Sequence, residues 1–400
     1  MPLQLHKRAA RLAPLLTGAL VWTIHWWMVL TNAEHFFRRD LALFALPSKH
    51  YWLERVRQGA LPEWTPLMSG GMPFLSDPAN QTFYPLNLLL LLGDSTWSSL
   101  TWFVLGHSAL SLAGFYLLAR TLRIRPWIAV WGALIYTLSG YTLSITDNLN
   151  YLPATAWAPI ALALYWRAIH QNMLVFAPLS GLSVGFIALG GDAVSASCLY
   201  GVMLVLAVTQ KQISFRAHMQ CVFIALLAGT LIACVQMVPA YPLIVESIRS
   251  AAVQGASAMS WSFPPIRGFE LVQPAIIGNV QYLELASSER LYPGKGFPWA
   301  ESVYVGMIPA LVALASIGTR QVQLWLTLFL VAFALSLGSH LPGVPTIWSS
   351  LIAFGTQRYP EKLLLFVTLF LCIGAAVAAN TQLRNLQCWW DRLSVFYRCS

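Results

Sequence analysis

Apolar stretches of about 17 to 24 residues recur along the whole chain, and they constrain the fold more than any other feature. About 20 residues of α-helix, at 1.5 Å per residue, cross a hydrocarbon layer of about 30 Å. Only 10% of the 400 residues are charged, whereas about a quarter of an average soluble protein is charged. The sequence therefore predicts an all-α polytopic bundle of transmembrane helices.

The apolar stretches divide into about ten predicted spans. They cover residues 12–31, 97–119, 127–145, 151–169, 173–190, 194–210, 219–241, 302–318, 323–338 and 362–380. The run "FYPLNLLLLL" at 83–92 is too short to cross and begins with a proline motif, so we expect a re-entrant or interfacial segment there. The first stretch is too long for a signal-peptide core and lacks a small-residue cleavage site, which favours an uncleaved span.

The charged residues predict the orientation of this bundle. Ten spans put both termini on one side, and 13 of the 24 basic residues fall on that side, against one of the 15 acidic residues. Basic residues favour the cytoplasmic side, so both termini are predicted to be cytoplasmic. The excess of basic residues on the cytoplasmic side then explains the net charge of +9. We therefore predict no nucleic-acid partner from this charge.

The long segments between spans lie on the opposite, outer face. They are 32–96 and 242–301, with a shorter one at 339–361, and we expect any chemistry there. Residues 1–400 are predicted to form a single membrane domain, with 381–400 as a basic cytoplasmic tail. No phosphate-binding glycine motif and no metal-ligand spacing occurs, so no cofactor is predicted, and a divalent metal is possible but not indicated.

Asp40 is the first candidate for chemistry. It lies nine residues beyond the first span and directly follows Arg38 and Arg39. A carboxylate at the mouth of the bilayer can act as a general base or hold a divalent metal. The two arginines would keep it ionised and can pair with phosphate oxygens. An amphipathic interfacial helix with water-facing charges explains the same residues equally well.

Further polar candidates stand in the loops after Asp40. The loop "GALPEWTPLMSGGMPFLSDP" is rich in proline, and a rigid loop at membrane level usually lines a cavity. Asp77 and Gln81 are the polar candidates of this loop, although Asp77 before Pro78 also fits an ordinary turn. Asp147, at the next outer turn, can reach a sugar or a metal, or it is an ordinary helix-end residue.

Arg358 and Lys362 stand at the outer mouth of the last span. Basic residues at the lipid–water boundary are suited to bind a lipid-linked phosphate. Snorkelling of their long side chains to the interface is the alternative explanation.

Several of these stretches together resemble a known family. The run 39–89, "RDLALFALPSKHYWLERVRQGALPEWTPLMSGGMPFLSDPANQTFYPLNLL", resembles the first outer loop of the bacterial YfhO-like membrane proteins, which belong to the GT-C superfamily of glycosyltransferases. The stretches "LNYLPATAWAPIAL", "VQMVPAYPLIVESIRSA", "ESVYVGMIPALVALA" and "FGTQRYPEKLLLF" fit the same family in consistent order. The resemblance covers residues 36 to 370.

The resemblance implies a function for two of the candidates. GT-C enzymes transfer a sugar from a polyprenyl-phosphate donor to an acceptor on the outer face, with an acidic residue in the first outer loop, and Asp40 matches that position. Arg358 occupies a place comparable to the basic residues that bind the donor phosphate. The YfhO-like branch glycosylates cell-envelope polymers such as teichoic acids, which implies a bacterial inner-membrane location. Two departures are a shorter chain and Asp192 where relatives more often have histidine.

The leading hypothesis is therefore an inverting membrane glycosyltransferase. Asp40 would deprotonate the acceptor, an envelope polymer or lipid, while Arg39, Arg358 and Lys362 would bind the donor phosphate and loop 62–85 would shape the pocket. A non-enzymatic lipid or polysaccharide transporter is the main alternative, although transport predicts ionisable residues near mid-span, and His25 and His107 are nearly the only ones. A scaffold of an envelope-assembly complex is the third hypothesis.

Overall fold

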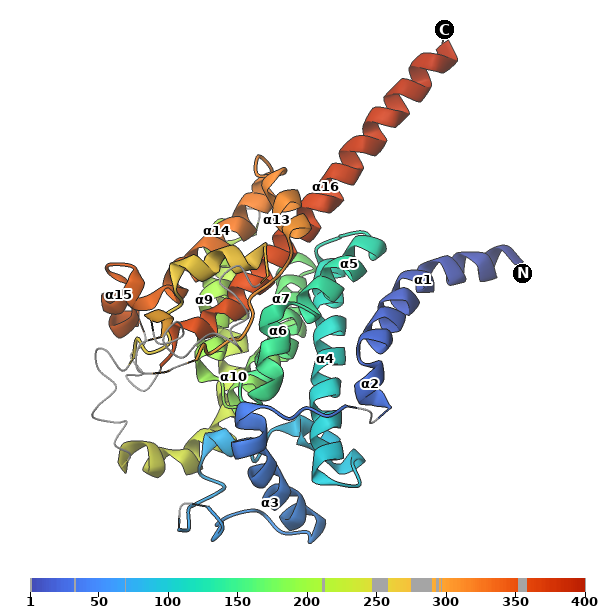
Figure 1. Ribbon diagram of the computed structural model, residues 1–400. Coiled ribbons are helices and arrows are strands. Elements are labelled where there is room, and N and C mark those ends of the chain that lie inside the picture. Colours follow the sequence, from blue (N-terminus) through green and yellow to red (C-terminus); the bar gives the residue numbers. More distant parts are fainter. Residues whose placement is uncertain are drawn as a thin grey trace.

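The described part of the chain is all-helical, as the sequence predicts (Figure 1). In the computed structural model it comprises residues 2–31, 34–68, 70–210, 213–246, 258–274, 290–292, 295, 297–351 and 358–399. Within these ranges no strand occurs, and the isolated bridge between Thr65 and Met72 is the one β-type pairing. Much of the predicted outer segment 242–301 lies outside the described residues.

Three described helices are long and apolar enough to cross a membrane. They are α4 (Thr96–Thr121), α10 (Phe215–Glu246) and the helical stretch Pro360–Gln387, which consists of a 3-10 turn and the first part of the last helix. A fourth candidate is a bent pair, in which α5 (Pro126–Thr137) meets the helical segment Gly140–Asp147 at 42°. This segment consists of α6 (Gly140–Ser144) and the 3-10 helix that follows it. These helices indicate a membrane protein.

Shorter helices occupy most of the other predicted spans. They are α1 (Pro2–His25), α7 (Leu152–His170), α8 (Phe176–Leu189), α9 (Ala193–Thr209) and α14 (Arg320–Ser336). Where we expected a span at 302–318, α13 (Met307–Leu314) has 8 residues, about 12 Å of rise, too short to cross. The run 83–92 forms the 3-10 helix η3 (Pro85–Leu92), also shorter than a crossing.

The last helix, α16 (Leu364–Cys399), is the centre of the bundle. Every residue from 360 to 378 is buried, so its first half is surrounded by protein on all sides. It packs against α13 and α14 on one side and against α5 on the other. A helix that is apolar all round and buried is typical of the core of a large bundle.

The helices α4, α7, α8 and α10 form the other half of the bundle and pack side by side. Small residues allow the closest approach, because a Cβ on Gly181 of α8 would collide with the backbone of Ala225 in α10. The opposite face of α10 leaves large apolar side chains uncovered: Phe223, Leu227, Leu231, Val235 and Val238. Such a face suits contact with lipid.

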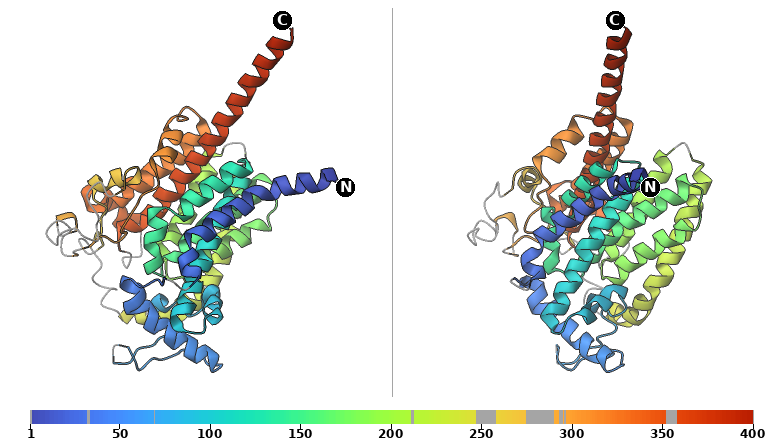
Figure 2. Two further views of the ribbon diagram at one scale, coloured as in Figure 1. Left: turned by 45° about the vertical axis from the view of Figure 1, so that its right-hand side comes forward. Right: turned by 90° about the vertical axis from the view of Figure 1, so that its right-hand side faces the viewer.

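Segment 32–96 folds into short elements at the end of the bundle away from both termini (Figures 1 and 2). They are the π-helix η1 (Leu41–Ala45), α3 (Leu46–Arg57), η2 (Pro78–Asn80) and η3. Buried Lys49 of α3 ties the segment together, since its ammonium donates to the Asn80 carbonyl (3.1 Å) and to Asn87 Oδ1 (3.0 Å).

The predicted tail 381–400 is not a separate element. Its described residues continue α16 as one helix, which projects beyond the bundle at the opposite end from α3 (Figure 2). The start of α1 lies toward the same end.

Candidate functional site

Asp40 lies at the junction of three segments that are distant in the sequence. It is exposed and begins η1, and its Oδ2 accepts a hydrogen bond from Asn148 Nδ2 (3.3 Å). Asn148 follows the 3-10 helix η4 (Ile145–Asp147), which ends the bent pair of helices. Asp40 is therefore oriented by the turn 145–148 while its carboxylate stays open to the surroundings.

Arg39 connects Asp40 to the other two segments. Its Nη1 lies 3.6 Å from Asp147 Oδ2 and donates to the Trp299 carbonyl (3.2 Å), and its guanidinium stacks over the Phe297 ring at 4.9 Å. The backbone of Arg39 is left-handed, with φ of 43°, a conformation that costs a non-glycine residue about 1–3 kcal/mol. Such strain persists where surrounding contacts enforce it, and it clusters at functional sites.

Arg38 makes a second ion pair beside the first. Its Nη1 lies 2.8 Å from Glu301 Oε2, with 51% of the arginine side chain and 22% of the glutamate side chain exposed. We call this half-open group the rim cluster: Arg38, Arg39, Asp40, Asp147, Asn148 and Glu301. It brings together Asp40, Arg39 and Asp147, which the sequence singled out one by one.

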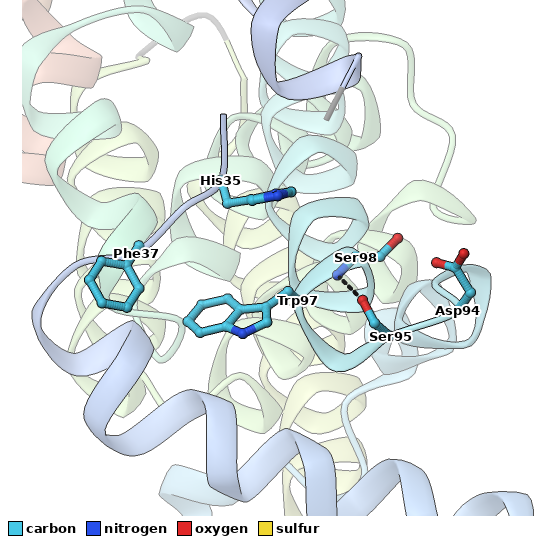
Figure 3. Close-up of a pocket in the computed structure, with 6 residues that line it drawn as sticks. All are labelled: His35, Phe37, Asp94, Ser95, Trp97 and Ser98. Atoms are coloured by element: carbon cyan, nitrogen blue, oxygen red, sulfur yellow. Dashed lines mark hydrogen bonds between the residues drawn. The ribbon is translucent and has the colours of Figure 1, made fainter. Parts of the chain in front are cut away.

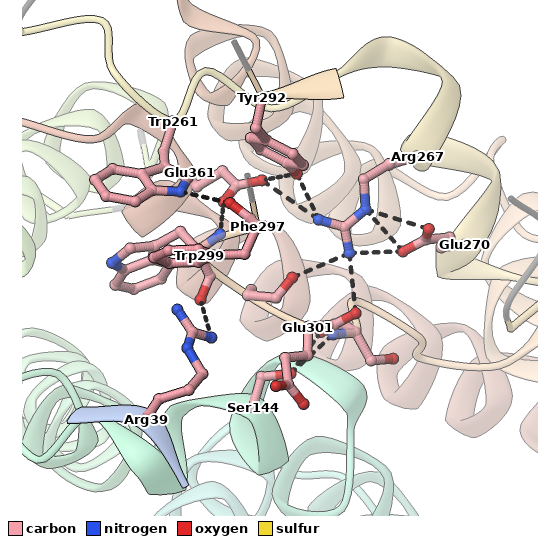
Figure 4. A network of polar contacts seen from close by, with 12 residues as sticks. Arg39, Ser144, Trp261, Arg267, Glu270, Tyr292, Phe297, Trp299, Glu301 and Glu361 are labelled. Carbon is pink, nitrogen blue, oxygen red and sulfur yellow. Dashed lines mark hydrogen bonds and ion pairs between the residues drawn. The ribbon is translucent and has the colours of Figure 1, made fainter. Parts of the chain in front are cut away.

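A second polar group lies fully inside the protein (Figure 4). Arg267, in the 3-10 helix η6 (Pro265–Leu271), is wholly buried and pairs with Glu270 at 2.8 Å and with Glu361 at 3.5 Å. Its Nη1 also donates to the Tyr292 hydroxyl (2.5 Å), and that hydroxyl donates to Glu361. We call Arg267, Glu270, Tyr292 and Glu361 the buried clamp.

Every nitrogen of the Arg267 side chain has a partner. Nε and Nη2 donate to Glu270, and Nη2 also reaches the carbonyl oxygens of Ala300 and Glu301. Burial would lower the pKa of Arg267, but Tyr292 and Glu361 outweigh this effect and the pKa rises. Burial, followed by the charge of Glu361, raises the pKa of Tyr292 well above its ordinary value. A saturated, buried group of this kind is structural.

Trp299 joins the two groups (Figure 4). Its backbone N–H donates to Glu361 Oε2 (3.0 Å), while its carbonyl accepts from Arg39. The neighbouring Ser302 N–H donates to the Ser144 hydroxyl at 2.9 Å. The segment 299–302 therefore contacts both groups and fixes the rim cluster relative to the buried clamp.

Lys362 directly follows Glu361 in the 3-10 helix η8 (Pro360–Leu363). Its side chain is buried, and its Nζ lies over the rings of Tyr151 (4.6 Å) and Tyr359 (5.1 Å). Burial raises the pKa of Asp192, and the charge of nearby Lys362 opposes that shift. Lys362 thus lies inside the protein, near Asp192, and not at an open lipid boundary as the sequence led us to expect.

Arg358 has an unused donor. Its Nε is buried and has no hydrogen-bond partner within the described ranges, although the residue as a whole is only half-buried. A buried donor without a partner destabilises a protein by about 1–3 kcal/mol, so such a group is suited to a ligand. Its neighbour Tyr359 packs against Trp261, whose ring also carries the Lys295 ammonium at 4.7 Å.

Asp77 and Gln81 build the loop that contains them. Asp77 accepts from the Ala79 N–H at 2.9 Å and caps η2. Gln81, also left-handed with φ of 56°, donates to the carbonyls of Leu149 (2.7 Å) and Gly190 (2.6 Å). The two hydrogen bonds of Gln81 tie segment 32–96 to two neighbouring turns.

Sequence reasoning missed Arg267, Tyr292, Lys295 and Glu301. An arginine in the predicted outer segment 242–301 was the available signal, but nothing in the spacing links Arg267 to Glu361. No group of three or more histidine, cysteine, aspartate or glutamate side chains suited to a metal occurs among the residues that the structure describes. The chemistry open to the rim cluster is proton transfer at Asp40 and anion binding at its arginines.

Comparisons with protein-family models, with curated proteins and with solved structures found no match to the chain. The class of protein that the fold and the site define is a helical membrane protein with a half-open ionic cluster at one end of its bundle.

Proposed function

We propose that this chain is a membrane glycosyltransferase of the GT-C type. It moves a sugar from a polyprenyl-phosphate donor to a hydroxyl of a cell-envelope polymer or lipid. The observation that carries the proposal is Asp40, an exposed carboxylate oriented by Asn148 beside the Arg39–Asp147 pair. A carboxylate with an open face, next to arginines at the end of a helical bundle, has the chemistry that a general base requires.

The reaction is a single displacement with inversion. The acceptor oxygen attacks the anomeric carbon and forms the new glycosidic bond, while its proton passes to the Asp40 carboxylate. The bond between the anomeric carbon and the phosphate oxygen breaks, and its electron pair leaves with the polyprenyl phosphate. Positioning and charge stabilisation supply most of the acceleration, because phosphate is already a good leaving group.

Two arginines support binding of the donor phosphate. Arg358 offers a buried Nε without a partner in the described residues, and Arg39 is one-quarter exposed beside Asp40. Charge-assisted hydrogen bonds from arginine to phosphate are among the strong ones. Lys362, buried behind Tyr151, contributes its field from inside the protein.

The proposed topology keeps an even number of the predicted spans and leaves out 302–318, whose helix α13 is too short to cross. The long helices α4, α10 and α16 are three of them, and the shorter apolar helices and the bent pair contribute others. Both termini would lie in the cytoplasm of a bacterium and the rim cluster on the outer face of its inner membrane. The same charge distribution along the chain supports this orientation.

The test is sugar transfer by the purified protein in liposomes, with a radiolabelled polyprenyl-phosphate sugar and an envelope-lipid acceptor. We expect Asp40→Asn to lower kcat on the order of 10²–10³-fold, because the amide accepts no proton. Glu54→Gln, which removes an exposed carboxylate of α3, is the matched control and should retain wild-type turnover. Near-normal turnover by Asp40→Asn would sink the assignment.

The alternatives predict other outcomes of the same preparation. A transporter would move the lipid-linked sugar across the liposome membrane without transferring it. A scaffold would do neither, and cells carrying Asp40→Asn and Arg358→Ala would keep their envelope glycosylation.

A further inference from the structure

A pocket of about 620 Å³ lies between the segment before Asp40 and the start of α4 (Figure 3). It is lined by His35, Phe37, Asp94, Ser95, Trp97 and Ser98. Its volume falls within the range of ordinary small-molecule sites. None of these residues belongs to the rim cluster or the buried clamp.

Two aromatic rings form one end of the pocket. The rings of Phe37 and Trp97 have centroids 5.7 Å apart and planes inclined by 48°. They touch each other, so no group can be sandwiched between them. Aromatic faces of this kind bind the C–H face of a sugar ring, whereas a cage for a quaternary ammonium needs rings on several sides.

The other end of the pocket is polar (Figure 3). The Asp94 carboxylate accepts hydrogen bonds, the Ser98 hydroxyl donates and accepts, and the His35 imidazole does both through its two nitrogens. No lysine or arginine is among the six lining residues, and the carboxylate repels anions. The lining therefore suits neutral hydroxyl groups and disfavours a phosphate.

Hydrogen bonds within the protein hold the segment 93–98 of the pocket in place before any ligand binds. Arg57 of α3 donates to the Gly93 carbonyl (3.0 Å), and His50 of α3 shares a hydrogen bond with the Thr96 hydroxyl (2.9 Å). The Ser95 hydroxyl accepts from the Ser98 N–H and caps α4. A preformed site loses less entropy when it binds a ligand.

We propose that this pocket is a saccharide-binding subsite for a neutral sugar unit of the acceptor. The proposal rests on the glycosyltransferase function proposed above. Phe37 precedes Asp40 by three residues, so their Cα atoms are at most about 11 Å apart. A sugar stacked on Phe37 and Trp97 would thus bind within the length of a short oligosaccharide from the Asp40 carboxylate.

The test is saturation-transfer NMR on the full chain in phospholipid nanodiscs, prepared without glycosidic detergents, whose headgroups would compete. The probes are methyl β-glucoside, methyl β-N-acetylglucosaminide and methyl α-mannoside, first as free sugars and then on a diacylglycerol anchor. We expect transfer from the protein to the ring protons of at least one sugar, and Trp97→Ala should weaken binding at least tenfold. Transfer to the anchored form alone identifies a glycolipid as the source of the sugar.

Three variants make the result specific. Trp97→Phe keeps an aromatic face and should retain most of the binding, while Asp94→Asn, at an exposed carboxylate, should weaken it severalfold. Trp102→Ala, another partly exposed tryptophan of α4, should leave binding unchanged. No transfer to any probe, equal transfer in Trp97→Ala, or displacement of the sugar by tetramethylammonium would overturn the proposal. Because no donor or turnover is needed, loss of the subsite and loss of the Asp40 chemistry are distinguishable.

Discussion

The buried clamp and the rim cluster both contain arginine and carboxylate side chains, yet they differ in burial and in how many of their polar atoms have partners. Arg267 is wholly buried, and each of its side-chain nitrogens has a partner. Arg38 is half exposed, and Asp40 accepts only the Asn148 hydrogen bond among the contacts of the described residues. A saturated buried group stabilises a structure, whereas an open group with unused capacity binds a ligand.

Removal of Arg267 should give the largest effect. Arg267→Met leaves Glu270 and Glu361 buried without their cation, and breaking a buried pair in this way costs about 3–5 kcal/mol. Arg38→Met, at the half-exposed pair with Glu301, should cost less than about 1 kcal/mol. Thermal unfolding of both variants in lipid nanodiscs measures the difference. Equal losses of stability would erase the distinction between the two groups.

Lys49 extends the comparison to a buried cation with neutral partners. Burial lowers the pKa of Lys49 from its ordinary 10.5 to about 7. Between these two pH values the unfolded chain binds a proton that the folded chain does not, so stability rises with pH and levels off above 10.5. Below about pH 7 both forms are protonated and the dependence disappears.

Because of Lys49, we expect the free energy of unfolding to rise by about 2–3 kcal/mol between pH 7 and pH 9. Lys49→Met should flatten the rise of the unfolding midpoint over that range relative to wild type. Asn80 and Asn87 contact the ammonium, Phe103 lies under it, and His107 is the nearby titratable group. An unchanged pH dependence in the variant would contradict this assignment.

Arg358 is expected to bind the donor phosphate and to contribute little to stability. Arg358→Gln removes a charge-assisted contact to the donor phosphate, and a loss of about 1.4 kcal/mol raises KM for the donor roughly tenfold. Stability should change little, because the buried Nε has no described partner to lose. Arg384→Gln, an exposed arginine of α16, is the control. A large loss of stability with unchanged KM would show that Arg358 stabilises the fold and does not bind the donor.

Glu301→Gln should give the smallest effect. The Arg38–Glu301 pair is partly exposed, and such pairs contribute about 0.2–1 kcal/mol. Salt screens them, so the difference from wild type should shrink further at about 1 M salt. Unfolding midpoints at low and high salt measure it, and a difference that persists at high salt would indicate a buried pair.

The sequence predicted the helical class, an apolar last helix and three residues that lie in the rim cluster. Asp40, Arg39 and Asp147 were recognisable as candidates because each is a charged residue that follows an apolar run. Their mutual placement was not predictable, since it depends on the left-handed backbone of Arg39 and the π-helix that follows it.

The buried clamp could not be predicted from the sequence for a different reason. Arg267 and Glu361 are 94 residues apart, and no periodic pattern encodes a contact over that distance. The helix α13 is shorter than the predicted span 302–318 because the chain runs non-helically from 302 to 306, with Gly306 at a φ of 121°. Apolar composition alone does not distinguish such a segment from a membrane helix.

The most direct test of the central claim is the separation of kcat from KM in Asp40→Asn. If the rim cluster is the chemical centre, kcat for sugar transfer falls on the order of 10²–10³-fold, while KM for the polyprenyl-phosphate donor changes little. If Asp40→Asn retains near-wild-type kcat, or changes only KM, Asp40 is not the base and the rim cluster is not the chemical centre.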